Sequence, residues 1–179
     1  MNDLLPFTTR HPMVQFGRDA AVFFRGFLGN PRMVASIIPS SYRTINLLLR
    51  PVAWESCRLF VEYGPGVGTF THHILARLPA NAKLLVIDTN PRFIGYLQEN
   101  IADPRFHAVL GSAADVDRFI AAIGESKADY ILSGLPFSSL SSELGRQIVA
   151  KTYSVLCEGG AFMTYQFRPT ARLLTAERF

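Results

Sequence analysis

The chain has 179 residues, 49% of them hydrophobic and 18% charged, and a formal net charge of +4 at pH 7. These values predict one globular domain with a sizeable core and exclude a disordered chain. All but three of the 18 basic residues are arginines, which bind phosphates bidentately. Phospholipid headgroups and nucleic acid are therefore compatible partners, and so is an enzyme with no polyanion partner.

The two cysteines, Cys57 and Cys157, lie far apart in the sequence and form no C-x-x-C motif. We expect two reduced core thiols of a cytosolic protein and no metal site. The sequence has no signal-peptide pattern, and Arg25 and Pro31 interrupt its apolar stretch at 20–38. These features predict a cytoplasmic protein, either soluble or peripheral on the inner face of a membrane.

The first predicted helix spans 13–28, after a proline-containing arm at 1–12. Its phenylalanines, which include Phe27, repeat on one face, and Arg18 and Arg25 lie two turns apart elsewhere. One interpretation is a helix on an anionic membrane surface, with aromatic rings at the acyl boundary and arginines at the headgroups. The other is a helix that packs its phenylalanines on the domain core. The pattern alone leaves both open.

A second predicted helix runs from Ser40 or Ser41 to Arg50, after the turn that Pro39 imposes. The serines are expected to cap this helix, and they are also candidates to hydrogen-bond a cofactor carboxylate. The apolar residues expected to face inward are Ile45, Leu48 and Leu49.

Five short apolar segments then alternate with helical patterns. The predicted strands span 58–63, 83–88, 106–110, 128–133 and 161–167. The predicted helices span 70–78, 90–99 and 142–156, with a turn and helix at 111–123 and a glycine pair at 159–160 before the last strand. This alternation predicts an α/β fold with a doubly wound, mainly parallel sheet. Residues 1–52 are expected to form a helical cap on a Rossmann-like core at 53–179.

A glycine-rich turn joins the first strand to the helix at 70–78. It carries Gly64, Gly66 and Gly68 in the pattern G-x-G-x-G. Glycine lets the backbone turn tightly and lets a ligand approach closely, because a Cβ would occupy the ligand's place. The next helix is expected to direct free N–H groups to the same place. The pattern indicates a ligand site, although ordinary tight turns also match it.

Two acids near this turn indicate which ligand suits it. Asp88 ends the second strand, twenty residues past Gly68, where a carboxylate can bind ribose hydroxyls. Glu62 precedes the first glycine by two residues and would repel a pyrophosphate. A cationic amino group and a sulfonium suit this acid, so the predicted ligand is S-adenosylmethionine.

Ligands of a doubly wound sheet lie beyond the carboxyl ends of its strands, so the loops after the first four strands converge. The glycine turn, Asp88 and the pair Ser112–Ala113 could hold the methionine, ribose and adenine parts of the cofactor in that order. The loop at 133–137 lies where a transferred methyl group would point.

Four segments together resemble the class I S-adenosylmethionine-dependent methyltransferases. They are Asn30-Pro31 with Pro39-Ser40-Ser41, the turn from Glu62 to Gly68, Ile87-Asp88-Thr89-Asn90, and Ser133-Gly134-Leu135-Pro136. More narrowly, the chain is similar to bacterial phospholipid N-methyltransferases, which convert phosphatidylethanolamine to phosphatidylcholine and are related to the rRNA adenine dimethylases. The first and last segments carry the narrower resemblance.

The resemblance implies methylation of a phospholipid headgroup amine at an anionic membrane surface, with S-adenosylhomocysteine as the second product. The candidate cofactor-binding residues are Ser41, Glu62, Gly64, Gly66, Gly68, Asp88, Thr89, Asn90, Ser112, Ala113, Ser133 and Gly134. The catalytic candidates are Tyr42, Pro136 and Phe137. The substrate-binding candidates are Arg18, Arg25, Phe27, Arg32 and Leu135. None of the four histidines is a compelling general base.

The loop at 133–137 distinguishes the related activities. Adenine N6-methyltransferases usually carry Asn or Asp, Pro, Pro and an aromatic residue here, and the first side chain binds the base. This chain lacks that polar side chain, so methylation of a base is disfavoured, and Phe137 could simply be buried after a turn. The alternatives are an rRNA adenine or small-amine methyltransferase, and a cofactor-binding module without activity.

Two departures from the class pattern affect these expectations. Ser112 stands where many methyltransferases have an acid that reaches the adenine amino group. The class fold ends in an antiparallel pair of strands, and the sequence predicts neither of them. The strand at 161–167 is therefore expected to be an exposed edge. Either the chain is truncated, or a partner, such as a second copy of the chain, would cover this edge.

Overall fold

The computed structural model describes residues 42–165 and 177–178, and the structural statements below concern this part of the chain. All of these residues belong to one of two compact units, Ala35–Phe179. The predicted arm, the predicted helix at 13–28 and the serine pair lie outside the described residues.

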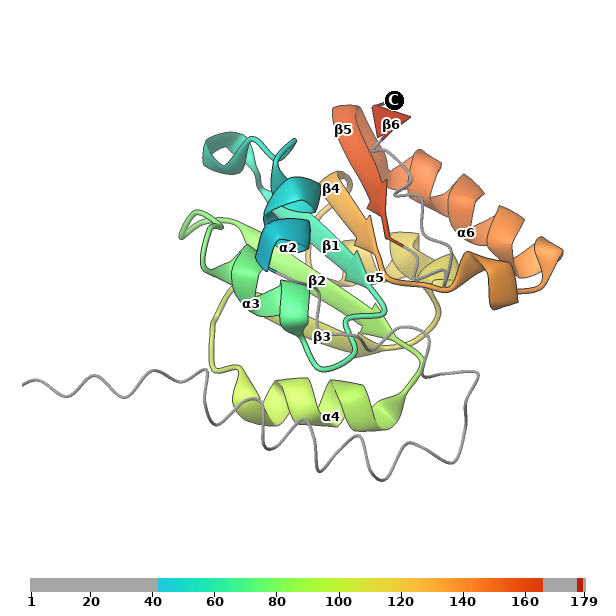
Figure 1. Ribbon diagram of the computed structural model, residues 1–179, viewed down its shortest axis with the longest axis horizontal. Coiled ribbons are helices and arrows are strands. Elements are labelled where there is room, and N and C mark those ends of the chain that lie inside the picture. The colour runs from blue at the N-terminus through green and yellow to red at the C-terminus, as the bar shows by residue number, and fades with distance from the viewer. Residues whose placement is uncertain (1–41, 166–176, 179) are drawn as a thin grey trace, which may run out of the picture. The chain divides into compact units, whose positions relative to one another are not determined.

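The core of the protein is a six-stranded sheet with the order β3-β2-β1-β4-β5-β6 (Figure 1). Its strands are β1 (Leu59–Tyr63), β2 (Lys83–Asp88), β3 (Phe106–Leu110), β4 (Ala128–Ser133), β5 (Leu156–Thr164) and β6 (Glu177–Arg178). The first five are parallel to their neighbours, and β6 is antiparallel to β5. The predicted doubly wound, mainly parallel sheet is thus confirmed.

Helices cover both faces of the sheet. They are α2 (Tyr42–Leu49), α3 (Thr69–Leu75), α4 (Pro91–Asn100), α5 (Val116–Ala122) and α6 (Ser142–Val155), with short 3-10 turns η2 (Trp54–Ser56), η3 (Ala113–Asp115) and η4 (Phe137–Ser139). One hydrophobic cluster contains α2, α3 and α4, and the other contains α5 and α6. Figure 1 shows α2 and α3 in front of β1 and β2.

Alternation along the central strand explains why both faces need helices. Phe60 packs in the cluster of α2, α3 and α4, whereas Leu59 and Val61 pack in the cluster of α5 and α6. Every residue of β1 is buried, as expected for a parallel strand between two helical layers. None of the described helices is both long enough and apolar enough to cross a membrane.

The predicted boundaries of β2, β3 and β4 are confirmed, but the predicted start of β5 is wrong. The strand begins at Leu156 and includes Gly159 and Gly160, where a register shift interrupts its pairing with β4. Gly159 has φ 74°, and a Cβ on Gly160 would lie 2.9 Å from the carbonyl oxygen of Cys157. The glycine pair therefore forms a bulge within the strand and does not precede it.

The far edge of β5 is covered in part by the chain itself. Ala161 pairs with Arg178 and Phe162 with Glu177 across β5 and β6. The sequence pattern did not indicate this short antiparallel strand. At these two positions the pairing groups of β5 do not need a partner chain.

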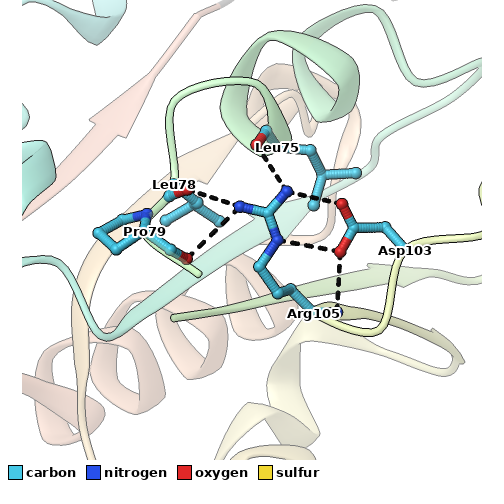
Figure 2. A network of polar contacts seen from close by, with 5 residues as sticks. All are labelled: Leu75, Leu78, Pro79, Asp103 and Arg105. Carbon is cyan, nitrogen blue, oxygen red and sulfur yellow. Dashed lines mark hydrogen bonds and ion pairs between the residues drawn. The ribbon is translucent and has the colours of Figure 1, made fainter. Parts of the chain in front are cut away.

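One arginine ties the loop after α3 to the turn before β3 (Figure 2). Arg105 donates to the carbonyl oxygens of Leu75 and Leu78 at 3.0 and 2.5 Å, and its Nε and Nη2 bind the Asp103 carboxylate at 2.9 and 2.6 Å. The guanidinium thereby pairs with the carbonyl of Leu75, the last residue of α3, and with the carbonyl of Leu78 in the loop after it. These hydrogen bonds also hold the pKa of Asp103 below its usual range.

Substitution Arg105→Lys is expected to lower the free energy of unfolding by about 2 kcal/mol, because an ammonium cannot reproduce the planar fork and leaves partly buried carbonyls unpaired. Urea unfolding followed by circular dichroism measures this effect. The control is Arg146→Lys, which changes an exposed arginine that pairs with Glu143 and should shift stability by less than about 0.5 kcal/mol. Equal effects in the two variants would contradict the prediction.

Candidate active site

Backbone hydrogen bonds hold together the segments that follow the parallel strands, at the carboxyl ends of these strands. Gly64 N–H donates to Ile87 O, and Gly134 N–H donates to Tyr63 O, both at 2.9 Å. Gly111 N–H donates to Asp88 O at 2.9 Å. The structure therefore brings together the four loops that the sequence predicted to converge. They lie at the carboxyl ends of the parallel strands, where ligands bind in open α/β sheets.

The three glycines of the turn share a backbone conformation that favours glycine, but they differ in what a side chain would meet. Gly64, Gly66 and Gly68 have φ of 64°, 58° and 84°, a backbone region that disfavours side chains. A Cβ on Gly68 would lie 2.6 Å from Leu97 Cδ2, and one on Gly64 would lie 3.2 Å from Leu135 Cδ2. A Cβ on Gly66 would meet no atom within 4 Å. The prediction that each Cβ would occupy the ligand's place therefore fits Gly66 alone.

Glu62 lies beneath this turn as a buried acid with 2% of its surface exposed. Thr71, in the first turn of α3, donates its hydroxyl to Glu62 Oε2 at 2.7 Å. Burial raises the pKa of Glu62 to about 8, and the nearby charge of Asp88 adds to this rise. The carboxyl thus keeps its proton at neutral pH until a cation is placed beside it. Thr71 was missed in the sequence, where it appears only as a polar residue between apolar helix positions.

The raised pKa of Glu62 makes the stability of the cofactor-free protein fall with rising pH. The folded state holds this proton more tightly than the unfolded state, whose pKa is 4.5, so the stabilising contribution is complete below pH 4.5 and is lost as pH rises to about 8. Each pH unit in this window costs up to about 1.4 kcal/mol. Glu62→Gln should therefore become more stable than the wild type between pH 5.5 and 8, as measured by urea unfolding without cofactor. Glu143→Gln, at an exposed position of α6, is the control and should show no such trend.

Asp88 is held by the backbone of the loop that it begins. Its Oδ1 accepts the N–H of Asn90 at 2.8 Å, and the N–H groups of Gly66 and Thr89 also bind the carboxylate. Burial raises the pKa of Asp88, and these three donors oppose that shift. The bond from Gly66 joins the acid to the glycine turn. A carboxylate has about four acceptor positions, so capacity remains for ribose hydroxyls.

The neighbouring polar candidates have local structural roles. Asn90 caps α4 by accepting the N–H of Arg92 at 3.0 Å, and Ser112 caps η3 by accepting the N–H of Ala114 at 3.2 Å. Thr89 is exposed and Ala113 is buried. Contacts of these four residues with a cofactor stay a prediction.

The loop after β4 begins at a fully buried residue. Ser133 Oγ accepts the N–H of Leu135 at 3.2 Å, while Leu135 and Pro136 are half-buried. The Phe137 ring packs edge-on against Phe162, with 6.5 Å between the ring centroids. Phe137 is only half-buried, so the alternative of a simply buried ring is not met in full. The catalytic roles of Pro136 and Phe137 stay predictions.

A tyrosine at the end of β5 completes the arrangement and was missed in the sequence. Tyr165 follows β5 directly, and its ring lies 4.7 Å from that of Phe70 on α3. Burial first, and then the charge of Glu62, raise the pKa of its hydroxyl. An aromatic residue at a strand end has no pattern in the sequence that sets it apart from core residues.

The remaining candidates cannot be placed. Five of them lie outside the described residues: Ser41, Arg18, Arg25, Phe27 and Arg32. Tyr42 begins α2, but its side chain is not described. Within the described part of the chain, no group of three or more His, Cys, Asp or Glu residues could hold a metal ion.

These features fit S-adenosylmethionine. Open space faces Gly66, a buried acid lies under the turn, and an oriented carboxylate ends β2. A parallel sheet of this order, with a glycine turn after β1 and an acid after β2, is the arrangement of class I S-adenosylmethionine-dependent methyltransferases and also of dinucleotide-binding domains.

Similarity to known proteins shows which family the chain belongs to. The chain is 31% identical over 146 residues to the ornithine lipid N-methyltransferase of Singulisphaera acidiphila, a match that covers 81% of this chain and 76% of that protein. The chain therefore belongs to the family of this lipid N-methyltransferase. A shorter match, 30% identical over 82 residues, links 45% of the chain to 26% of the ribosomal RNA small subunit methyltransferase H of Shewanella denitrificans. No family model matches the chain.

Solved structures share the fold at low sequence identity. A 1,6-didemethyltoxoflavin-N1-methyltransferase of Burkholderia thailandensis with bound S-adenosylhomocysteine has a TM-score of 0.55 and 14% identity, over 92% of this chain and 66% of that one. The cyclopropane synthase MmaA2 of Mycobacterium tuberculosis has a TM-score of 0.56 and 14% identity, over 68% of this chain and 41% of that one. The chain thus spans only part of either structure. The protein is an S-adenosylmethionine-dependent methyltransferase.

Proposed function

We propose that this enzyme methylates the amine nitrogen of a membrane lipid headgroup, with phosphatidylethanolamine and other aminolipids as the acceptor class. The observation that carries this proposal is the match over 76% of a protein named ornithine lipid N-methyltransferase. The loop after β4 supports it, because Gly134 offers no side chain to bind a flipped base.

The chain's own residues provide positioning more than acid or base chemistry. S-adenosylmethionine supplies an electrophilic methyl group on a sulfonium. Glu62, which Thr71 holds in place, would offer a negative charge to the cofactor's amino group once its proton is released, and Asp88, held by the Asn90 N–H, would accept hydrogen bonds from the ribose. The loop at 133–137 and the glycine turn would line the space around the methyl group, and the acceptor amine must arrive neutral so that its lone pair can attack.

A labelled-methyl transfer assay tests the acceptor. Purified protein and labelled S-adenosylmethionine are incubated with vesicles that carry phosphatidylethanolamine, its monomethyl and dimethyl forms or ornithine lipid, and separately with RNA or soluble amines. We expect label in the lipid fraction. Label in RNA or in a soluble amine would replace the lipid proposal. Cofactor binding without transfer to any acceptor would favour a binding module without activity.

We further propose that the protein acts as a peripheral enzyme at an anionic membrane surface, with Arg18, Arg25, Phe27 and Arg32 as the contact. Co-sedimentation with vesicles that contain phosphatidylglycerol should decrease in the double variant Arg18→Ala/Arg25→Ala and at high salt. The matched control is Arg118→Ala/Arg146→Ala, two arginines whose side chains are about three-quarters exposed. Undiminished binding of the first variant would contradict the proposed contact.

A further inference from the structure

Gly134 is a glycine because of space and not because of backbone conformation. Its φ is not positive, unlike those of Gly64, Gly66 and Gly68. A Cβ at Gly134 would lie 2.7 Å from the hydroxyl oxygen of Tyr165 and 3.0 Å from the carbonyl oxygen of Gly64. The phenol therefore occupies the place where a side chain of the β4 loop would begin, next to the first glycine of the turn.

The position of this phenol is fixed by its surroundings. The backbone N–H of Tyr165 donates to Ser133 O at 3.1 Å, which continues the pairing of β5 with β4. Its ring packs at 4.7 Å against Phe70 of α3, at an interplanar angle of 33°. Two strands and one helix thus direct the hydroxyl of the half-buried Tyr165 to the junction of the β4 loop and the glycine turn.

The hydroxyl stays protonated over the physiological range. Burial raises the pKa of Tyr165, and the charge that Glu62 carries once it has lost its proton raises it further, so a phenolate does not form and the residue cannot act as a base. A neutral phenol is still a hydrogen-bond acceptor through its oxygen lone pairs. The hydroxyl oxygen can therefore accept a hydrogen bond from a ligand N–H placed at this junction.

We propose that the Tyr165 hydroxyl accepts a hydrogen bond from the N–H of the acceptor amine and so directs the nitrogen lone pair at the methyl group. This inference rests on the proposed lipid amine function. The lone pair forms the new N–CH3 bond, and the S–CH3 bond breaks with its electron pair passing to sulfur. The resulting ammonium then loses its N–H proton to water.

The proposed contact has a consequence that depends on the number of methyl groups already present. A primary and a secondary amine carry an N–H for the phenol, whereas a tertiary amine carries none. The hydroxyl should therefore assist the first and second transfers and contribute nothing to a third. A purely structural role of the tyrosine would affect all acceptors equally.

The test is Tyr165→Phe, which keeps the ring and removes only the hydroxyl. With phosphatidylethanolamine and its monomethyl form in vesicles, kcat should fall about tenfold, the effect of one hydrogen bond, while the dimethyl form keeps its wild-type kcat. Affinity for S-adenosylmethionine, measured by calorimetry, should not change. The control is Tyr130→Phe, whose hydroxyl accepts the N–H of Ala53 at the opposite end of β4 and should leave kcat unchanged.

Three results would overturn the role of Tyr165. They are an equal loss on all three lipids, a weakened cofactor affinity with unchanged kcat, and no effect at all. These results differ from the one expected if the proposed lipid function were wrong. In that case the wild type itself would methylate none of the lipid amines.

Discussion

Replacement of Asp88 by alanine is expected to weaken the binding of S-adenosylmethionine about a hundredfold. The carboxylate is oriented by three backbone N–H groups, which leave acceptor positions for ribose hydroxyls. Hydrogen bonds to a charged group contribute about 1.5–3 kcal/mol each, and the loss of two such bonds to ribose hydroxyls costs at least about 3 kcal/mol. Isothermal calorimetry with S-adenosylmethionine and with S-adenosylhomocysteine measures the loss.

Two further variants separate this effect from damage to the loop. Asp88→Asn keeps an acceptor oxygen for the backbone and removes the charge. Its affinity for the cofactor should therefore lie between that of the wild type and that of Asp88→Ala. Asp115→Ala removes a half-exposed carboxylate near Arg118 and should bind the cofactor normally. If Asp88→Ala bound as tightly as Asp115→Ala, the assignment of the ribose site would be wrong.

Gly66→Ala is expected to weaken cofactor binding by at least about tenfold while the fold survives. Within the protein a Cβ at this position meets open space, so the methyl group would intrude only on the ligand. The positive φ of 58° adds a strain of about 1 kcal/mol in the folded state. Calorimetry gives the change in affinity, and urea unfolding gives the change in stability.

Gly124→Ala is the matched control for this substitution. Gly124 also has a positive φ, 80°, and a Cβ there would meet no atom within 4 Å, but it follows α5 and is not part of the glycine turn. Both variants should lose about 1 kcal/mol of stability, and only Gly66→Ala should lose affinity. Gly68→Ala should be less stable than either, because its Cβ would contact Leu97 at 2.6 Å.

The two acids of the site differ in the state in which they meet the cofactor. Glu62 is buried against Thr71 and keeps its proton at neutral pH in the absence of a cation. Asp88 is stabilised by backbone N–H groups that oppose the effect of burial. Binding of a cationic amino group beside Glu62 is therefore expected to release a proton, whereas the ribose finds a preformed acceptor.

The local sequence was sufficient to predict the limits of elements whose apolar residues form a regular pattern that ends at a polar residue or a glycine. The predicted limits of β2, β3 and β4 agree with the structure because short apolar runs end at a polar residue or a glycine. The predicted start of β5 is wrong because a glycine pair has the same sequence pattern in a turn and in a bulge. The choice depends on the neighbouring strand, whose register shifts between Ala128 and Tyr130.

The sequence by itself determined the class of the fold, the cofactor and the position of the acids, because spacing along the chain fixes where a turn, a strand end and a carboxylate fall. Only the tertiary structure decided what each residue contacts. The space beside Gly134 is filled by Tyr165 from another strand, and the protonation of Glu62 depends on burial and on Thr71. Such contacts join residues that are distant along the chain, and burial is a property of the packed core, so neither is contained in a local pattern.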